Sequence, residues 1–194
     1  MAELLGTHPL EAWSTALERL PDTVGITVEP FVAMAVVRLG AVGAAASEAL
    51  GADLPTMPNT WAQHGTGRAV WLGPDEWLLS STTETPEELE GRIRAAVLPL
   101  GGSATDVSAQ RIGLRLTGAR LRDVLAKGCS IDLHPRVFGR GSSAQTLLGQ
   151  AGVVLLALSG AGDDFVVLVR SSFAGYLADW LLDAALEFTP THDS

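Results

Sequence analysis

The sequence predicts an α+β fold in which a strand–helix–strand–strand–helix unit occurs twice in tandem, with the helices packed on antiparallel or mixed sheets. Short apolar strands alternate with short helices, glycines end the first helix of each half, and each strand pair ends in two serines. The halves cover about residues 31–100 and 103–188, within one domain over 31–189. We expect the halves to pack about a pseudo-twofold axis.

The N-terminal region, residues 1–30, is expected to form a separate helix and a linker, and residues 190–194 a disordered tail. Thr7 is a suitable N-cap for a helix over 8–20. Its apolar residues recur at helical spacing. They are Leu10, Trp13, Leu17 and Leu20. The linker follows over 21–30.

The first repeat begins with the strand MAVVRLG at 34–40 and the helix AVGAAASEALG at 41–51, which ends in a glycine suited to a left-handed cap. RAVWLGPDEWLLSS, at 68–81, then predicts two strands joined at Pro74. Thr85 and Glu88 have the spacing of a capping box. The buried face of the helix that follows is expected at Leu89, Ile93, Ala96 and Val97.

The second repeat has the same order. RIGLRLTG at 111–118 alternates apolar and other residues, as in a strand with one buried face. A helix over 119–128 is expected to end at Gly128 as its cap, and residues 153–172 predict the strand pair. The last helix has a broad apolar stripe. It comprises Phe173, Tyr176, Leu177, Trp180, Leu181 and Ala184.

The composition is that of a folded globular protein, since 47% of the 194 residues are hydrophobic and 18% are charged. The net charge of −9 disfavours nucleic acid and anionic membranes as partners. The N-terminus has no signal-peptide pattern, and no apolar run is long enough to span a bilayer. One cysteine cannot form an internal disulfide, so we expect a cytoplasmic protein.

The stretch KGCSIDLHPR, residues 127–136, brings a thiol, a carboxylate and an imidazole close together in sequence. Cys129 follows the C-terminus of a predicted helix, where the negative end of the helix dipole disfavours a thiolate. The equivalent position in the first repeat is Ala52. A packing role for Cys129 is therefore preferred over a thiol enzyme, and Arg136 is expected to pair with Asp132.

Other catalytic patterns are missing from the sequence. The histidines are scattered singly, without metal-ligand spacing, and no phosphate-binding glycine loop or G-x-S-x-G motif is present. Two acidic pairs, Asp163 with Asp164 and Asp75 with Glu76, fall in predicted turns. We therefore assign no catalytic, cofactor-binding or metal residues to this chain.

Several long segments resemble the gamma subunit of bacterial heterotetrameric sarcosine oxidase. They are WLGPDEWLL, DVSAQRIGLRLTG, LRDVLAKGCSIDLHPRVFG, SSAQTLLGQAGVVLLAL and DDFVVLVRSSFAGYLADWLLDA. The resemblance covers about residues 30–188 and extends to the folate-binding domain of the glycine-cleavage aminomethyltransferase. In those folate enzymes an aspartate follows the glycines of one strand, whereas residues 151–156 here carry leucines, which cannot act as acid or base.

The resemblance implies a non-catalytic assembly subunit of a complex that converts sarcosine to glycine and hydrogen peroxide and transfers a one-carbon unit to tetrahydrofolate. It implies alpha, beta and delta partner subunits that carry FAD, FMN, NAD, tetrahydrofolate and zinc. We expect the partner interface in the loop from Asp132 to Gln145, which core packing does not explain. Its candidates are Asp132, His134, Arg136, Arg140 and Gln145. The alternative is a stand-alone module that binds folate or one-carbon units.

Overall fold

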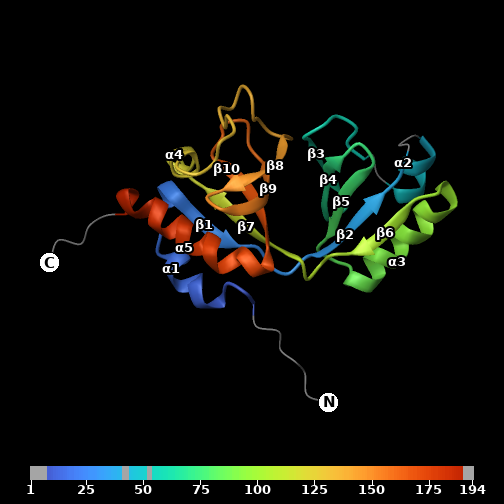
Figure 1. Ribbon diagram of the computed structural model, residues 1–194, viewed down its shortest axis with the longest axis horizontal. Helices are drawn as coiled ribbons and strands as arrows, with labels where there is room; N and C mark the ends of the chain where they lie inside the picture. Colours follow the sequence, from blue (N-terminus) through green and yellow to red (C-terminus); the bar gives the residue numbers. More distant parts are fainter. Residues whose placement is uncertain (1–7, 41–43, 52–53, 190–194) are drawn as a thin grey trace, which may run out of the picture.

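The computed structural model describes residues 8–40, 44–51 and 54–189 of the chain. Within these ranges the chain forms two five-stranded antiparallel sheets with helices, as the predicted α+β class requires (Figure 1). The expected N-cap Thr7, the repeat position Ala52 and the tail 190–194 lie outside the described residues.

The strands and helices follow the predicted order, with additional strands between them. The first half comprises β1 (Gly25–Val28), β2 (Ala33–Arg38), α2 (Ala44–Leu50), β3 (Trp61–His64), β4 (Gly67–Gly73), β5 (Glu76–Ser81) and α3 (Pro86–Val97). The second half comprises β6 (Ser103–Asp106), β7 (Arg111–Thr117), α4 (Leu121–Ala126), β8 (Ser143–Leu148), β9 (Ala151–Ala157), β10 (Asp164–Arg170) and α5 (Ala174–Ala185).

The two sheets exchange their first strands. The first sheet has the order β6-β2-β5-β4-β3 and the second β1-β7-β10-β9-β8. Strand β1 precedes β2 in the chain but pairs with β7, and β6 precedes β7 but pairs with β2. The orders match strand for strand, which agrees with the expected pseudo-twofold relation. The predicted linker over 21–30 therefore contains a strand of the second sheet.

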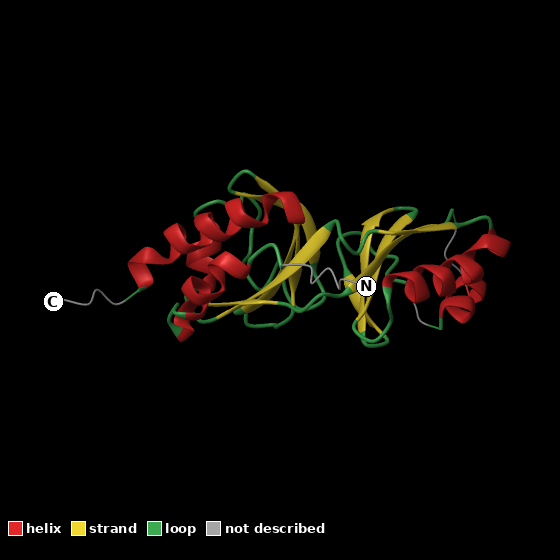
Figure 2. Cartoon of the chain, turned by 90° about the horizontal axis from the view of Figure 1, so that it is seen from below, coloured by secondary structure: helices red, strands yellow, loops and turns green. Residues whose placement is uncertain are grey.

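Helices cover the outer faces of the sheets, and the inner faces pack against each other, as Figure 2 shows from below. One apolar core lies between α5, α4 and the second sheet, and another between α3, α2 and the first sheet. The third lies between the sheets. Its buried residues are Met34, Val70, Leu78, Val154, Leu156, Val166 and Leu168.

Polar contacts also join the sheets. Glu29, which follows β1, accepts two hydrogen bonds from the Arg68 guanidinium of β4, at 2.8 and 3.2 Å. A Cβ on Gly113 would lie 2.5 Å from a Glu29 carboxylate oxygen, so the ion pair needs glycine there. The indole nitrogen of Trp61 in β3 donates to the carbonyl of Ala157 in β9, at 3.0 Å.

Two local expectations change in the structure. The N-terminal helix is short, with a 3₁₀ turn over Glu11–Trp13 and then α1 over Ser14–Glu18. Gly51 has the expected left-handed conformation at φ 68°, but Gly128 does not have a positive φ. A Cβ on Gly128 would instead lie 2.4 Å from the Trp180 ring, so close packing explains this glycine.

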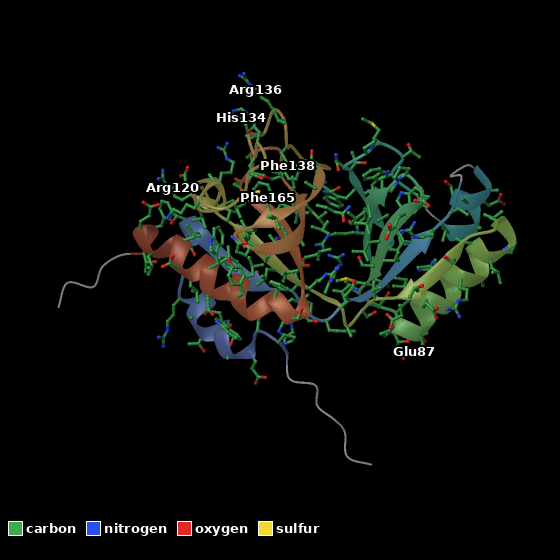
Figure 3. All side chains as sticks on the ribbon, viewed as in Figure 1. Glu87, Arg120, His134, Arg136, Phe138 and Phe165 are labelled. Atoms are coloured by element: carbon green, nitrogen blue, oxygen red, sulfur yellow. The ribbon has the colours of Figure 1, made fainter. Side chains whose placement is uncertain are left out.

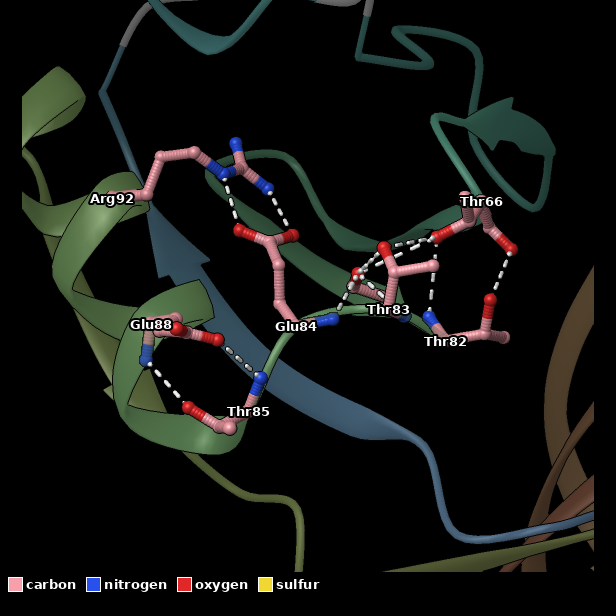
Figure 4. A network of polar contacts seen from close by, with 8 residues as sticks. Thr66, Thr82, Thr83, Glu84, Thr85, Glu88 and Arg92 are labelled. Atoms are coloured by element: carbon pink, nitrogen blue, oxygen red, sulfur yellow. Dashed lines mark hydrogen bonds and ion pairs between the residues drawn. The ribbon is translucent and has the colours of Figure 1, made fainter.

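The capping box of α3 is confirmed. The Glu88 N–H donates to the Thr85 hydroxyl at 3.3 Å, and the Thr85 N–H donates to the Glu88 carboxylate at 2.9 Å (Figure 4). The carboxylate of Glu84, just before the cap, accepts two hydrogen bonds from the Arg92 guanidinium in the second turn of α3. These contacts fix the start of α3 against the end of β5.

Replacing Thr85 by alanine should lower the free energy of unfolding by about 1 kcal/mol, because the Glu88 N–H loses its acceptor. Urea denaturation followed by circular dichroism measures this change. Thr85→Ser keeps the hydroxyl and should remain close to the wild type. An alanine variant as stable as the wild type would show that the cap does not contribute.

Glu29→Gln should destabilise the chain by roughly 1–3 kcal/mol, because it leaves the Arg68 guanidinium half-buried without a carboxylate. Arg38→Gln is the matched control, since its ion pairs lie on an exposed side chain, and it should change stability by less than about 0.5 kcal/mol. Equal effects of the two substitutions in urea denaturation would contradict a special role for the pair between the sheets.

Candidate functional site

The loop between α4 and β8 is held by two apolar side chains and exposes polar ones. Leu133 and Phe138 are buried in the core of the second half. The Phe138 ring stacks on Phe165 of β10, with 6.2 Å between the ring centroids. Figure 3 shows Phe138 next to Phe165, and His134 and Arg136 at the outer end of the loop, away from the sheets. The loop therefore has a fixed base and an accessible tip.

Backbone hydrogen bonds shape the tip. The Asp132 carboxylate accepts the His134 N–H at 2.8 Å, and Nδ1 of His134 accepts the Arg136 N–H at 3.2 Å. The N–H groups of Val137 and Phe138 both donate to the His134 carbonyl. The expected ion pair between Asp132 and Arg136 does not form, because the carboxylate caps the backbone instead.

The other two predicted interface residues lie in different settings. Arg140 is exposed near the end of the loop. Gln145 belongs to β8, because the strand begins at Ser143, so the predicted loop is shorter than expected. The Gln145 side-chain amide donates to the Leu72 carbonyl of β4 at 2.8 Å and thereby links the two sheets.

A segment of the first half lies beside this loop. The N–H of Ser143 donates to the Asn59 carbonyl at 2.8 Å, and the N–H of Trp61 donates to the Gly141 carbonyl at 2.9 Å. Asn59 is the one non-glycine residue with positive φ, at 58°, in the part of the chain that the structure describes. We call residues 55–60 and 132–142 together the candidate partner surface.

The candidate partner surface combines exposed apolar and basic side chains. Met57 is 70% exposed and Val137 is 65% exposed. Arg136 and Arg140 make no ion pair with any described residue, although the chain carries a net charge of −9. Such a surface suits a partner with both apolar and acidic groups. Met57 was not predicted; its signal in the sequence is an apolar side chain inside the turn TMPNT.

Cys129 has a structural environment, as the sequence predicts. Its N–H donates to the Leu125 carbonyl at 2.9 Å, and its side chain packs against the core of the second half. Asp132 and His134 are bonded to the loop backbone and make no hydrogen bond with the thiol in the described structure. The packing of Cys129 against the core is the role that the sequence favoured for it.

A second polar site lies at the end of the first sheet next to α3. A cavity of about 260 Å³ is lined by His64, Thr66, Thr83, Glu84 and Arg92, among others. His64 is 4% exposed, and its Nδ1 has no hydrogen-bond partner among the described residues. Burial, and then the nearby Arg92, lowers the pKa of His64, while Glu84 raises it. The imidazole is therefore neutral at pH 7.

None of the helices within residues 8–40, 44–51 and 54–189 is both long and apolar enough to cross a membrane. The same ranges hold no group of three or more His, Cys, Asp and Glu residues placed to bind a metal ion.

Residues 37–187 match the model of the sarcosine oxidase, gamma subunit family. The chain belongs to this family. The match includes the candidate partner surface and every strand of both sheets except β1 and most of β2.

Curated members of the gamma subunit family are similar along most of their length. Sarcosine oxidase subunit gamma of Corynebacterium sp. strain P-1 is 38% identical over 148 residues, which are 75% of this chain and 70% of the relative. The same subunit of Arthrobacter sp. is 38% identical over 150 residues, covering 76% and 72%.

Two solved structures share the fold. A chain of the heterotetrameric sarcosine oxidase from Corynebacterium sp. U-96, solved with pyrrole 2-carboxylate, gives a TM-score of 0.83 at 30% identity and covers 97% of this chain and 98% of that one. The aminomethyltransferase T of the glycine cleavage system from Bartonella henselae gives 0.58 at 14% identity, covering 88% of this chain and 48% of that one. The second likeness confirms the aminomethyltransferase-like fold.

The lowered pKa of His64 predicts a pH dependence of stability. Unfolding returns the imidazole to its ordinary pKa of 6.5, so the unfolded chain takes up a proton more readily than the folded chain. The contribution of neutral His64 is complete above pH 6.5 and decreases as the pH falls from 6.5 toward the lowered native value. His64→Gln should remove this slope when urea denaturation is repeated at several pH values. An unchanged slope would contradict the assignment.

Proposed function

We propose that this chain is the gamma subunit of a heterotetrameric sarcosine oxidase and has a structural, non-catalytic role in that complex. The observation that carries the proposal is the likeness to one chain of the Corynebacterium heterotetramer, which extends over 97% of this chain and 98% of that one.

The proposed complex oxidatively demethylates sarcosine to glycine with formation of hydrogen peroxide and transfers the one-carbon unit to tetrahydrofolate. Alpha, beta and delta subunits are the proposed partners, and they would hold FAD, FMN, NAD, tetrahydrofolate and zinc. The cytoplasm is the proposed location. Leu155 of β9 is buried in the core between the second sheet and its helices, and Leu156 is buried in the core between the sheets. Their burial supports the proposal that this strand lacks the functional aspartate of the folate enzymes.

The candidate partner surface is the proposed contact with a neighbouring subunit. Its backbone is held in place by Phe138 and by the hydrogen bonds between residues 59–61 and 141–143, so binding requires little ordering of the chain. Val137 and Met57 offer apolar area, and Arg136 with Arg140 offers positive charge that no described residue pairs.

Affinity purification of the tagged chain from its own cells tests the proposed function. We expect larger subunits in the mass spectrum, a flavin absorption spectrum, and sarcosine-dependent hydrogen peroxide formation by the purified complex. A solitary, colourless chain would contradict the assembly role. If that solitary chain bound tetrahydrofolate in a calorimetric titration, the stand-alone folate module would be the better assignment.

The double substitution Arg136→Ala and Val137→Asp should weaken association with the partner subunits by about tenfold or more, because it removes a charge and places a carboxylate in an apolar contact. Native mass spectrometry of the reconstituted complex measures the bound fraction. Arg19→Ala is the matched control: this arginine is exposed and follows α1, on the opposite side of the second half from the loop (Figure 1). Unchanged assembly of the double variant would exclude this surface.

A further inference from the structure

Two arginines without acidic partners lie side by side in the second sheet. Arg111 of β7 and Arg170 of β10 are direct cross-strand neighbours in the antiparallel register. Like charges at such positions repel each other and destabilise a sheet. Within the described residues neither of them takes part in an ion pair, whereas seven of the 13 basic residues of the chain do.

The pair is not neutralised by its surroundings. Arg111 is partly buried, and its Nε has no hydrogen-bond partner in the described part of the chain. Burial, and then the charge of Arg170, lowers the pKa of Arg111. Glu76 acts in the opposite direction, but its carboxylate binds Arg38 at 2.6 Å. A buried guanidinium nitrogen without an acceptor is costly, so an acceptor from outside the chain would stabilise this arrangement.

A cavity of about 490 Å³ opens at this pair. Besides Arg111 and Arg170, its lining includes Ser130, Thr146 and Gly152 and no acidic residue. The Ser130 hydroxyl makes no hydrogen bond with other described residues, so it is available as a donor, whereas the Thr146 side chain lies on the helix-covered face of β8 with Ala144 and Leu148. Guanidinium and hydroxyl donors around one cavity are the groups that bind oxyanions.

Gly152 provides the space for a ligand. The register of β9 with β10, continued by one residue, places Gly152 next to Arg170 on the same face of the sheet. A Cβ on Gly152 would meet nothing within 4 Å, and its φ is not positive. Neither close packing nor backbone conformation requires glycine here, and a larger side chain would fill the cavity beside the arginines.

We propose that Arg111 and Arg170 form an oxyanion-binding site, which takes a phosphate or carboxylate group between the two guanidinium groups. The ligand is either a small free anion or a carboxylate of a neighbouring subunit, since both present the same acceptor oxygens. The site lies on the inner face of the second sheet and is distinct from the candidate partner surface. It does not depend on the proposed function.

Binding of inorganic phosphate to the full-length chain tests this site, with isothermal titration calorimetry at constant ionic strength as the measurement. We expect saturable binding by the wild type. Arg170→Gln and Gly152→Val should each weaken it at least tenfold, the first by loss of a charged donor and the second by filling the cavity. Arg19→Gln, at an exposed arginine outside the site, should bind phosphate like the wild type. Circular dichroism confirms that each variant is folded.

Absence of phosphate binding by the wild type, or equal binding by all variants, would overturn the proposal.

The same titration on the chain within its purified complex distinguishes the two sources of the ligand. Phosphate binding that persists there indicates a free anion. Binding that disappears on assembly, together with weaker association of Arg170→Gln, indicates a carboxylate of a neighbouring subunit. A chain that purifies alone and still binds phosphate would contradict the proposed function and leave the oxyanion site supported.

Discussion

The exchange of β1 and β6 between the two sheets is the constraint on which the rest of the structure depends. Each sheet needs a strand from the other half of the chain, so neither half can complete its hydrogen bonding alone. The exchange also brings Glu29, just after β1, over Gly113 and into contact with Arg68. The apolar cluster between the sheets and this ion pair therefore form together.

At the opposite edges of the sheets, β3 and β8 meet through Thr60 and Ser142. Residues 59–61 and 141–143 are joined by hydrogen bonds there, which connects the turn that carries Met57 with the end of the loop that carries Val137. The candidate partner surface thus requires both halves in their native arrangement. A partner that binds there would contact the two halves at once and would stabilise the arrangement of the sheets by mass action.

The arginines fall into two groups: those that form ion pairs within the chain, and those that form none with a described residue. Most basic residues are used within the chain, as in the pairs Arg92 with Glu84 and Arg115 with Asp164. Arg136 and Arg140 on the loop, and Arg111 with Arg170 on the second sheet, form no ion pair with a described residue. In an acidic chain, positive groups left without partners favour anionic ligands or acidic protein surfaces at those places.

Local sequence patterns predicted the α+β class, the order of β2, β4, β5, β7, β9 and β10, the capping box at Thr85 and the loop with His134 and Arg136. They did so because apolar periodicity, caps and turn residues act locally. They did not reveal β1, β3, β6 and β8, which are edge strands with few apolar residues, as in SATD and GITV. The exchange of strands, the hydrogen bonds of Asn59 and Trp61 with the end of the loop, and the pairing of Arg111 with Arg170 depend on register between distant segments. Only tertiary structure decides such contacts, because the hydrogen bonds that fix them join residues that no local pattern connects.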